Sequence, residues 1–327
     1  LFPALLFYFF LLSNAVIKVF ICDTLSKKFS ILRATHTMNR KGIILAGGKG
    51  TRLYPITKAL PKCLLPIYDM PMIYHSVSTL MLSGIRDILV ITTPSDRDRV
   101  TELLGNGEKW GINLEYEIQD KPKGIAEALI IAEKFLNNNP CVLMLGDNIF
   151  YGPNLGEKLM RASMSEKNTI FTYEVPDPER FGICELDDNS KVISIEEKPL
   201  KPKSNLCVTG LYFFDELAPV IASNLSPSER GELEITDVNK HYLNKNILYA
   251  EVLDQHYTWI DAGTVESFLQ ASLFVKSIEI GSGTKVSCPE EIAYNNKWID
   301  IAEIKNIAHD LNNSPYSEYL LNIAKNN

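Results

Sequence analysis

A glycine-rich loop stands directly after the apolar run that forms the first expected strand. The apolar run covers residues 42–46, and the loop covers residues 47–52, with glycine at three of its six positions. Glycines let backbone N–H groups approach a phosphate without interference from a Cβ atom. The loop lacks the Ser or Thr that Walker A requires after Gly-Lys, and Leu53 replaces the last glycine of the Rossmann pattern. Alone, such a cluster predicts a tight turn, but Arg52 and Lys62 add the positive charge that favours phosphate binding.

Charged side chains also stand at the ends of later apolar runs. Asp147 follows the run at residues 141–145, and Asp261 follows the apolar pair at 259–260. Ligand sites of α/β proteins lie at the carboxyl ends of parallel strands, which makes both aspartates candidates. Each could instead cap a helix N-terminus. Lys198 could likewise be a solvated lysine in an ordinary run of charges.

The elements that must position these residues alternate in type from residue 41 onward. Strands are expected at 42–46, 88–92, 113–118 and 141–145, and helices at 72–82, 97–104 and 125–136. Short strands that alternate with longer helical patterns imply βαβ units and a mostly parallel sheet. The sequence therefore predicts an α/β, Rossmann-like sheet flanked by helices.

The pattern changes after residue 165. Strands are expected at 169–175, 182–186, 192–197 and 207–214, with few helices between them. This predicts an insertion of antiparallel strands on the α/β core. A long helix is expected at 264–279, and the remainder, to Asn327, is expected to form short helices.

Composition excludes some classes of protein. The 327 residues carry a formal net charge of −7 and a pI of about 5.4, which argues against a broad nucleic-acid interface. The six cysteines are scattered, with neither a CxxC pair nor a nearby His at zinc spacing. We therefore expect a reduced, intracellular protein without disulfides or structural zinc.

Residues 1–38 are expected to be a leader or upstream extension outside the fold. The apolar run at 5–12 has no basic residue before it and is short for a membrane span. We expect no membrane association, with an anchor formed by residues 1–22 as the alternative. Met38 stands just before the first expected strand.

The order of motifs resembles that of bacterial glucose-1-phosphate thymidylyltransferases. The match begins with residues 47–55, Lys62 and residues 65–74. It continues with the family's spacing through residues 80–88, 146–152, 177–180, 196–199, 202–205, 208–213, 230–237, 259–264 and 286–292. The resemblance covers residues 41 to about 320. It implies a nucleotide-diphospho-sugar transferase fold at 39–327, with a nucleotide-binding half (39–165), a sugar-binding half (166–263) and a helical tail (264–327).

The resemblance also implies a reaction. A deoxythymidylyl group would pass from dTTP to α-D-glucose 1-phosphate, giving dTDP-glucose and pyrophosphate, the first step of dTDP-rhamnose and deoxysugar biosynthesis. The sugar phosphate would attack the α-phosphorus in line, with Mg²⁺ assistance. That phosphate is already an anion near neutral pH, so no general base is required. The family's enzymes are cytoplasmic and usually homotetrameric.

Residue roles follow from the same resemblance. Arg52 and Lys62 would hold the triphosphate, Lys198 would hold the sugar phosphate, and Asp147 and Asp261 would bind Mg²⁺. The implied nucleotide-binding residues are Leu45, Gly47, Gly48, Gly50, Thr51, Arg52, Gln119 and Gly124. The implied sugar-binding residues are Asn148, Gly182, Glu197, Lys198 and Val208. Without the resemblance, Gln119 could be a solvated strand end.

Some positions depart from the family pattern. Cys63, Glu127 and Phe181 stand where Gln, Gln and Tyr are common, so the hydroxyl expected at position 181 is missing. Residues 254–256 lack an Arg that is usual near the family's second nucleotide site, which serves feedback.

Two alternative functions remain open. A uridylyltransferase that makes UDP-glucose would share the cations and both aspartates, although residues 67–69 and 177–180 favour the thymidylyl branch. A non-catalytic nucleotide-sugar-binding protein on the same fold would be indicated by loss of Lys198 or of an aspartate, and all three are present.

Overall fold

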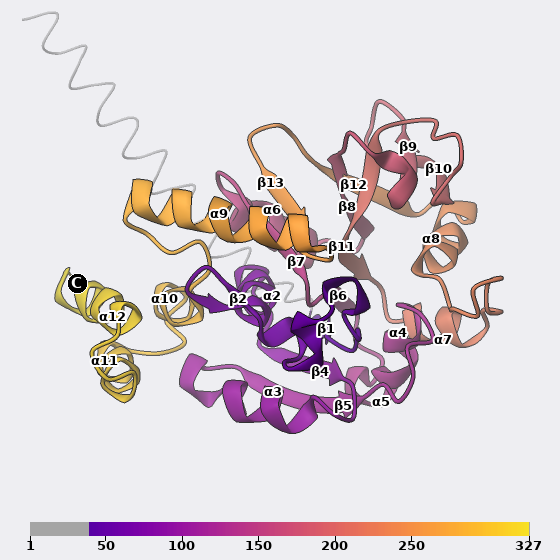
Figure 1. Cartoon of the computed structure of the whole chain (residues 1–327). Helices are drawn as coiled ribbons and strands as arrows, with labels where there is room; N and C mark the ends of the chain where they lie inside the picture. Colours follow the sequence, from indigo (N-terminus) through magenta and orange to yellow (C-terminus); the bar gives the residue numbers. More distant parts are fainter. Residues whose placement is uncertain (1–38, 327) are drawn as a thin grey trace, which may run out of the picture. The chain divides into compact units, whose positions relative to one another are not determined.

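A mixed nine-stranded sheet forms the centre of the protein (Figure 1). The computed structural model describes residues 39–326, so the leader expected at 1–38 lies outside the described residues. The strands of this sheet are β1 (Lys41–Leu45), β4 (Asp87–Thr92), β5 (Asn113–Ile118), β6 (Cys141–Leu145), β8 (Asn168–Glu174), β9 (Gly182–Leu186), β10 (Val192–Glu197), β11 (Leu206–Phe214) and β12 (Leu248–Leu253). Their order is β10-β9-β11-β6-β1-β4-β5, with β8 between β11 and β12.

The first half of the sheet is parallel, as the alternating pattern predicts. β1 pairs in parallel with β4 and β6, and β4 pairs in parallel with β5. Successive side chains of a strand point to opposite faces. Ile43 accordingly joins Leu89 in one core, while Ile44 joins Val90 in a second core. Both faces are therefore apolar, which explains why these strands read as continuous hydrophobic runs.

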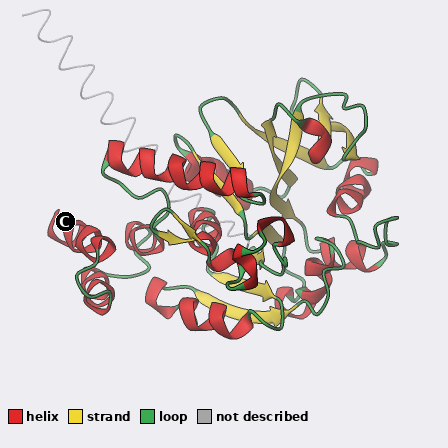
Figure 2. Cartoon of the chain, viewed as in Figure 1, coloured by secondary structure: helices red, strands yellow, loops and turns green. Residues whose placement is uncertain are grey.

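Helices cover both faces of the sheet (Figure 2). The Ile44 core receives α2 (Met72–Leu82), α3 (Arg97–Leu104) and α6 (Leu155–Met164). The Ile43 core receives α4 (Glu127–Ile131), α5 (Glu133–Leu136), α7 (Ala218–Ser223) and α8 (Ile235–Asn244). The single helix expected at 125–136 is wrong: it is interrupted at Ala132, whose ψ of −7° departs from the helical value of about −42°. The α/β fold class is confirmed.

Strand β11 joins the parallel half to the expected antiparallel insertion, which is also confirmed. It runs antiparallel to β6, β8 and β9, and β10 continues antiparallel to β9. The strand β12, which was not predicted, pairs in parallel with β8. One continuous sheet thus carries residues of both halves of the chain.

Two small sheets were not predicted. β7 (Asn148–Tyr151) pairs antiparallel with β13 (Thr258–Asp261), with Asn148 opposite Asp261. β2 (Pro66–Ile67) pairs with β3 (Met70–Pro71). In this pairing, β7 begins directly after Asp147 and β13 ends at Asp261. The pairing of β7 with β13 therefore brings the two aspartates close together.

The C-terminal region is helical, as expected. Its helices are α9 (Val265–Ser282), α10 (Pro289–Asn295), α11 (Ile301–Asp310) and α12 (Pro315–Asn326). α9 begins with a capping box in which Thr264 accepts from the backbone N–H of Ser267 and Ser267 bonds back to the N–H of Thr264. The long helix is thus confirmed, one residue from its expected start and three residues beyond its expected end.

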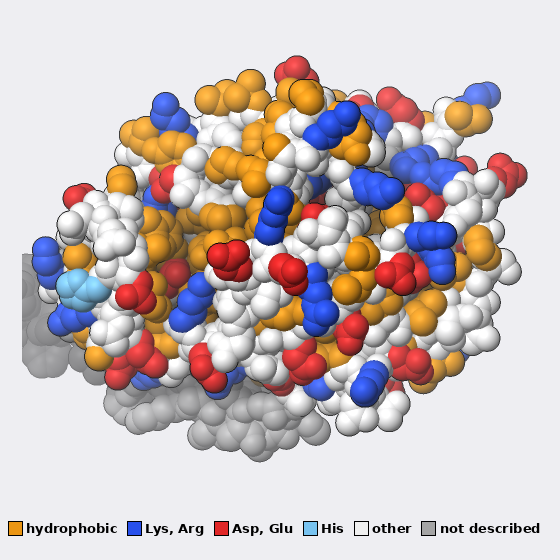
Figure 3. All heavy atoms as spheres, turned by 60° about the horizontal axis from the view of Figure 1, so that its bottom comes forward, with side chains coloured by type: hydrophobic (Ala, Val, Ile, Leu, Met, Phe, Trp, Pro, Cys, Tyr) orange, Lys and Arg blue, Asp and Glu red, His pale blue; other side chains and the backbone are white. Residues whose placement is uncertain are grey.

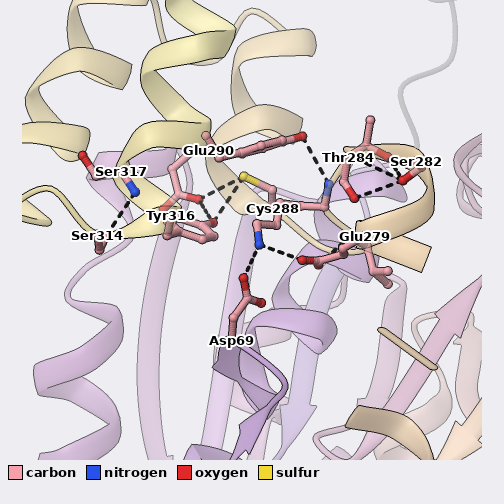
Figure 4. Close-up of polar contacts among 12 residues, drawn as sticks. Asp69, Glu279, Ser282, Thr284, Cys288, Glu290, Ser314, Tyr316 and Ser317 are labelled. Atoms are coloured by element: carbon pink, nitrogen blue, oxygen red, sulfur yellow. Dashed lines mark hydrogen bonds and ion pairs between the residues drawn. The ribbon is translucent and has the colours of Figure 1, made fainter. Parts of the chain in front are cut away.

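Buried polar groups attach this tail to the body (Figure 4). Glu290 accepts a hydrogen bond from the Tyr316 hydroxyl at 2.6 Å. It also accepts one from Trp110 Nε1 at 2.9 Å. Lys285 forms an ion pair with Asp69, in the turn between β2 and β3. Residues from three distant parts of the sequence therefore meet around α10.

A buried arginine fixes the start of the sheet. The Arg40 guanidinium donates to the carbonyls of Cys141 (3.3 Å), Ser163 (3.0 Å), Ser165 (2.6 Å) and Phe214 (2.6 Å). Burial lowers its pKa, and the four carbonyl groups offset part of that desolvation. Arg40 thus joins β6, α6 and β11 at the amino end of the parallel strands.

The described residues place charges of both signs on the surface and keep their thiols buried. Lys and Arg side chains are interspersed with Asp and Glu on the face that Figure 3 shows. The five cysteines within residues 39–326 are free and buried. Across the same residues, no helix has the length and apolar character needed to cross a bilayer.

Candidate active site

A cavity of about 670 Å³ opens at the carboxyl ends of β1 and β6 and extends toward the antiparallel strands. This is the edge of an open α/β sheet where ligands bind. Every residue that the sequence analysis assigned to catalysis, nucleotide, sugar or metal lines this cavity. The structure therefore brings the predicted residues together, while their individual roles stay predictions.

The glycine-rich loop forms one wall of the cavity. Gly50 has a φ of +58°, and a Cβ atom there would lie 2.9 Å from Thr57 Cγ2. The Thr57 hydroxyl donates to the Gly50 carbonyl at 2.7 Å, which holds the loop in this conformation. The loop leads into a 3₁₀ helix, η1 (Thr51–Leu53), that carries the exposed Arg52. Glycine at position 50 is thus required by both backbone angle and space.

The two aspartates do not cap helices. Asp147 follows β6 and is itself followed by the strand β7, and the N-cap of α9 is Thr264. The backbone N–H of Ala262 donates to the Asp147 carbonyl at 2.9 Å, which ties the two segments together. The alternative that Asp147 and Asp261 serve as N-caps is therefore wrong.

The electrostatics of the aspartate pair are unequal. Burial alone would raise the pKa of Asp147, but the ion pair with Lys62 and the hydrogen bond from Asn148 outweigh it and lower that pKa. Burial, and then the charge of Asp147, raise the pKa of Asp261 to about 6. The lowered pKa favours the charged form of Asp147, whereas the charged form of Asp261 would be stabilised by a neighbouring cation.

This donor set fits a hard cation that takes oxygen ligands. Mg²⁺ is usually held by one or two carboxylates together with substrate phosphates. No cluster of three or more His, Cys, Asp or Glu suited to a metal occurs within residues 39–326, so such an ion would depend on ligands from the substrates.

Gln119 lines the cavity and is buried, with 4% of its surface exposed. Its Nε2 donates to Glu127 Oε2 at 2.8 Å and to the Gly124 carbonyl at 3.3 Å. Its Oε1 faces Gly47, where an added Cβ would lie 2.8 Å away. The alternative of a solvated strand end is therefore wrong for Gln119.

Glu197 and Lys198, at the end of β10, also line the cavity. Glu197 Oε2 accepts from the Thr236 hydroxyl at 2.6 Å, and Glu197 Oε1 lies 3.7 Å from Lys198 Nζ. Lys198 has a φ of +44°, a conformation that non-glycine residues rarely adopt and that clusters at functional sites. Its backbone N–H donates to the Phe181 carbonyl at 3.0 Å, which fixes the strand end beside the cavity.

The side chain of Asn148 is held by several hydrogen bonds within the protein, beyond any contact that it makes with a ligand. It is 2% exposed, and its Oδ1 accepts from Trp259 Nε1 at 2.6 Å and from the Gly210 N–H at 3.0 Å. Its Nδ2 donates to Asp147 Oδ1 at 2.9 Å, which leaves one amide hydrogen for a ligand. Asn148 therefore also orients Asp147.

Several residues that line the cavity were not singled out from the sequence. They are Arg180, Tyr212, Arg230, Thr236 and Trp259. Arg230 and Thr236 lie within a segment that carried the resemblance, and Trp259 stands two positions before Asp261, so position in a motif was an available signal.

Phe181 turns out to form an apolar wall of the cavity. Its ring packs edge-on against Trp259, with centroids 5.4 Å apart, and the Arg180 guanidinium lies 5.2 Å from the centroid of its ring. These contacts involve the aromatic ring alone, so they do not depend on a hydroxyl at position 181.

Comparison with known proteins gives the same family as the resemblance of the sequence motifs. The nucleotidyl transferase family model matches residues 41–278. A glucose-1-phosphate thymidylyltransferase of Xanthomonas campestris pv. campestris (strain B100) is 50% identical over 287 residues, which cover 88% of this chain and 97% of the relative.

Solved structures agree with the fold. A Bacillus anthracis protein assigned to the glucose-1-phosphate thymidylyltransferases, crystallised in complex with a sucrose, is 43% identical. Its TM-score is 0.66, and the match covers 72% of this chain and 94% of that one. A UDP-glucose pyrophosphorylase complexed with UDP-glucose shares the fold at 24% identity and a TM-score of 0.66, over 74% and 100% of the two chains. The chain belongs to the nucleotidyl transferase family and, within it, to the glucose-1-phosphate thymidylyltransferases.

Proposed function

We propose that the protein transfers the deoxythymidylyl group of dTTP to α-D-glucose 1-phosphate, with release of pyrophosphate and formation of dTDP-glucose. The observation that carries this proposal is a single cavity lined by the amide of Gln119, by Glu197, and by the cations and carboxylates of Arg52, Lys62, Lys198, Asp147 and Asp261. In a pathway, this reaction is the first step toward dTDP-rhamnose and other deoxysugars.

Positioning and fixed charge account for the proposed chemistry. The sugar phosphate is its own nucleophile, so the protein has to bring two polyanions together and stabilise the departing pyrophosphate. We assign Arg52 and Lys62 to the triphosphate above the glycine-rich loop, and Lys198 to the sugar phosphate. Lys62 is 10% exposed and paired with Asp147, so its charge is held in place before substrate binds.

We assign Mg²⁺ to Asp147 and Asp261. When bound, the ion would neutralise part of the negative charge of the phosphates. Lys62 and Asn148 hold Asp147 in position from two sides, which is support of the kind that metal-binding carboxylates usually receive.

The proposal also includes a preference for thymine over uracil as the nucleotide base. The thymine methyl is worth about 1 kcal/mol in an apolar pocket, so UTP should be a weaker but real substrate. The alternative, a uridylyltransferase, is supported only by a fold that the two groups share. The second alternative, a non-catalytic binding protein, is disfavoured because Lys198, Asp147 and Asp261 all line the cavity.

One assay tests the proposal. Pyrophosphate release is measured with dTTP, UTP, ATP, CTP and GTP, each against a panel of sugar 1-phosphates. We expect the highest specificity constant for dTTP with glucose 1-phosphate. A wide margin in favour of UTP or ATP would overturn the assignment.

We further propose a cytoplasmic homotetramer that requires neither nucleic acid nor a membrane. An apolar surface on α9 supports self-association. It consists of side chains that are between 48% and 68% exposed, those of Val265, Leu269, Leu273 and Ile280. Their spacing of four, four and seven residues places them on a single helical face. Sedimentation of the purified protein measures the subunit number directly.

A further inference from the structure

The hydrogen bonds of Gln119 fix which of its two amide atoms faces the cavity. Its nitrogen has two partners, the carboxylate of Glu127 at 2.8 Å and the carbonyl of Gly124 at 3.3 Å. Both partners can only accept a hydrogen bond, so only the NH₂ group of Gln119 satisfies them. The oxygen must then point the other way, and it faces Gly47 in the glycine-rich wall.

Glu127 is well placed to impose this orientation. Its side chain is 17% exposed, and its second oxygen, Oε1, lies 3.7 Å from Lys123 Nζ. A carboxylate has no hydrogen to donate, whereas the glutamine that is common at this position in similar sequences offers both a donor and an acceptor. With glutamine at 127, a Gln119 amide turned by 180° would keep a partner there and lose only the longer bond to Gly124.

We propose that Glu127 is a positioning residue for base selection: it holds Gln119 with its oxygen, and not its nitrogen, toward the nucleotide base. The inference rests on the proposed function, which puts the base beside Gln119. Thymine and uracil carry an N3–H that can donate to this oxygen. Cytosine has an acceptor at N3, so it would meet the lone pairs of Gln119 and lose the bond.

Glu127 therefore strengthens discrimination against cytosine without contacting the base. Discrimination between thymine and uracil should not depend on it, because both have the same N3–H group. A purely structural role of Glu127 would lower activity with every nucleotide alike, so the ratio of two specificity constants separates the two explanations.

The test compares kcat/KM for dTTP, UTP and dCTP with glucose 1-phosphate. We expect Glu127→Gln to lower the dTTP-to-dCTP ratio roughly tenfold, the effect of one hydrogen bond, and to leave the dTTP-to-UTP ratio unchanged. Glu127→Met, which fills a similar volume without an acceptor, should also lower the first ratio and provides the answer if Glu127→Gln is unstable. The matched control Lys123→Gln removes the neighbouring ion pair and should leave both ratios as in the wild type.

Three results would overturn the inference. One is an unchanged dTTP-to-dCTP ratio in a folded Glu127→Gln or Glu127→Met protein that still turns over dTTP, which would refute the role of Glu127 alone. Another is a wild-type protein that does not use dTTP, which would refute the proposed function together with the inference. A ratio that falls equally in Lys123→Gln would assign the effect to local charge and also count against the proposal.

Discussion

At the scale of single residues, the cavity depends on charges held in fixed places. Lys198 is about half exposed, and its ion pair with Glu197 joins atoms 3.7 Å apart. Such a side chain contributes little to folding. We propose that Lys198 acts on a bound ligand, and this can be measured.

We expect Lys198→Ala to lower turnover about a hundredfold, because one preorganised electrostatic contact is typically worth ~3 kcal/mol in a transition state. The melting temperature should stay close to that of the wild type. Steady-state kinetics and thermal unfolding of the same preparation check both statements. The control is Lys201→Ala, an exposed lysine that does not line the cavity. Near-normal turnover of Lys198→Ala would remove this residue from the reaction.

The two aspartates should respond to mutation in opposite ways when no metal is present. Asp261→Asn removes a buried charge that lies beside Asp147, so the metal-free protein should be as stable as the wild type or more stable. Asp147→Asn leaves Lys62 without its ion-pair partner and should cost about 1–3 kcal/mol. Chemical unfolding in a chelating buffer measures both changes.

Both substitutions should nevertheless abolish most activity. An amide binds Mg²⁺ less well than a carboxylate, so we expect partial recovery at high Mg²⁺ or with Mn²⁺. The double mutant should lose less than the two single losses combined, because both residues act through one ion. Activity as a function of Mg²⁺ concentration is the measurement. An unchanged Mg²⁺ requirement in either single mutant would exclude that residue as a ligand.

At the scale of elements, most segments with a clear apolar pattern were predictable, whereas the shortest strands were not. The pattern of apolar residues places α2, α3, β5 and β6 at their observed bounds. The strands β7 and β13 have four residues each and pair across more than a hundred positions, so neither has a local signal. The same limit applies to the site: Gln119 was a candidate, but its orientation comes from Glu127 on a different element.

Helix α2 carries the group from which we expect a pH effect on stability. His75 is fully buried, its Nδ1 lies 2.8 Å from Ser287 Oγ, and its Nε2 has no partner among the described residues. Burial lowers the pKa of His75 to about 4. A depressed pKa gives stability that is present above the unfolded-state value of about 6.5 and is lost as the pH falls toward 4.

Between pH 7 and pH 5, this titration should cost about 2 kcal/mol of unfolding free energy, because each pKa unit is worth about 1.4 kcal/mol. His75→Gln cannot titrate and should lack that part of the pH dependence. Urea unfolding of both proteins at the two pH values measures it. Parallel losses in the wild type and in His75→Gln would show that His75 is not the group responsible.

At the scale of the whole molecule, the fold described here starts at Arg40. We propose that a chain that begins at Met38 folds and is fully active, because the Arg40 anchor, the family match and every residue of the cavity lie after that point. Expression of that chain, followed by thermal unfolding and the pyrophosphate assay, tests this. Loss of folding, or activity recovered only from membranes when residues 1–38 are present, would contradict it.

The overall arrangement was predictable because βαβ units fix the direction of the strands, and residues at the carboxyl ends of β1 and β6 then share an edge. The connection between the parallel and antiparallel halves of the sheet was not predictable. β11 contacts β6, β8 and β9 at once, and no property of residues 206–214 alone indicates three partners. Tertiary pairing decided that part of the topology.

The position of Arg40 has a practical consequence for handling the enzyme. Its four carbonyl partners lie at the amino end of the parallel strands, whereas the cavity lies at their carboxyl end. A carrier bead, affinity tag or scaffold protein fused ahead of Arg40 would therefore be attached on the side away from the substrate entrance. An enzyme immobilised through this point should keep its cavity accessible to nucleotides. The position ahead of Arg40 is therefore the preferred attachment site for a reusable preparation that synthesises activated sugars.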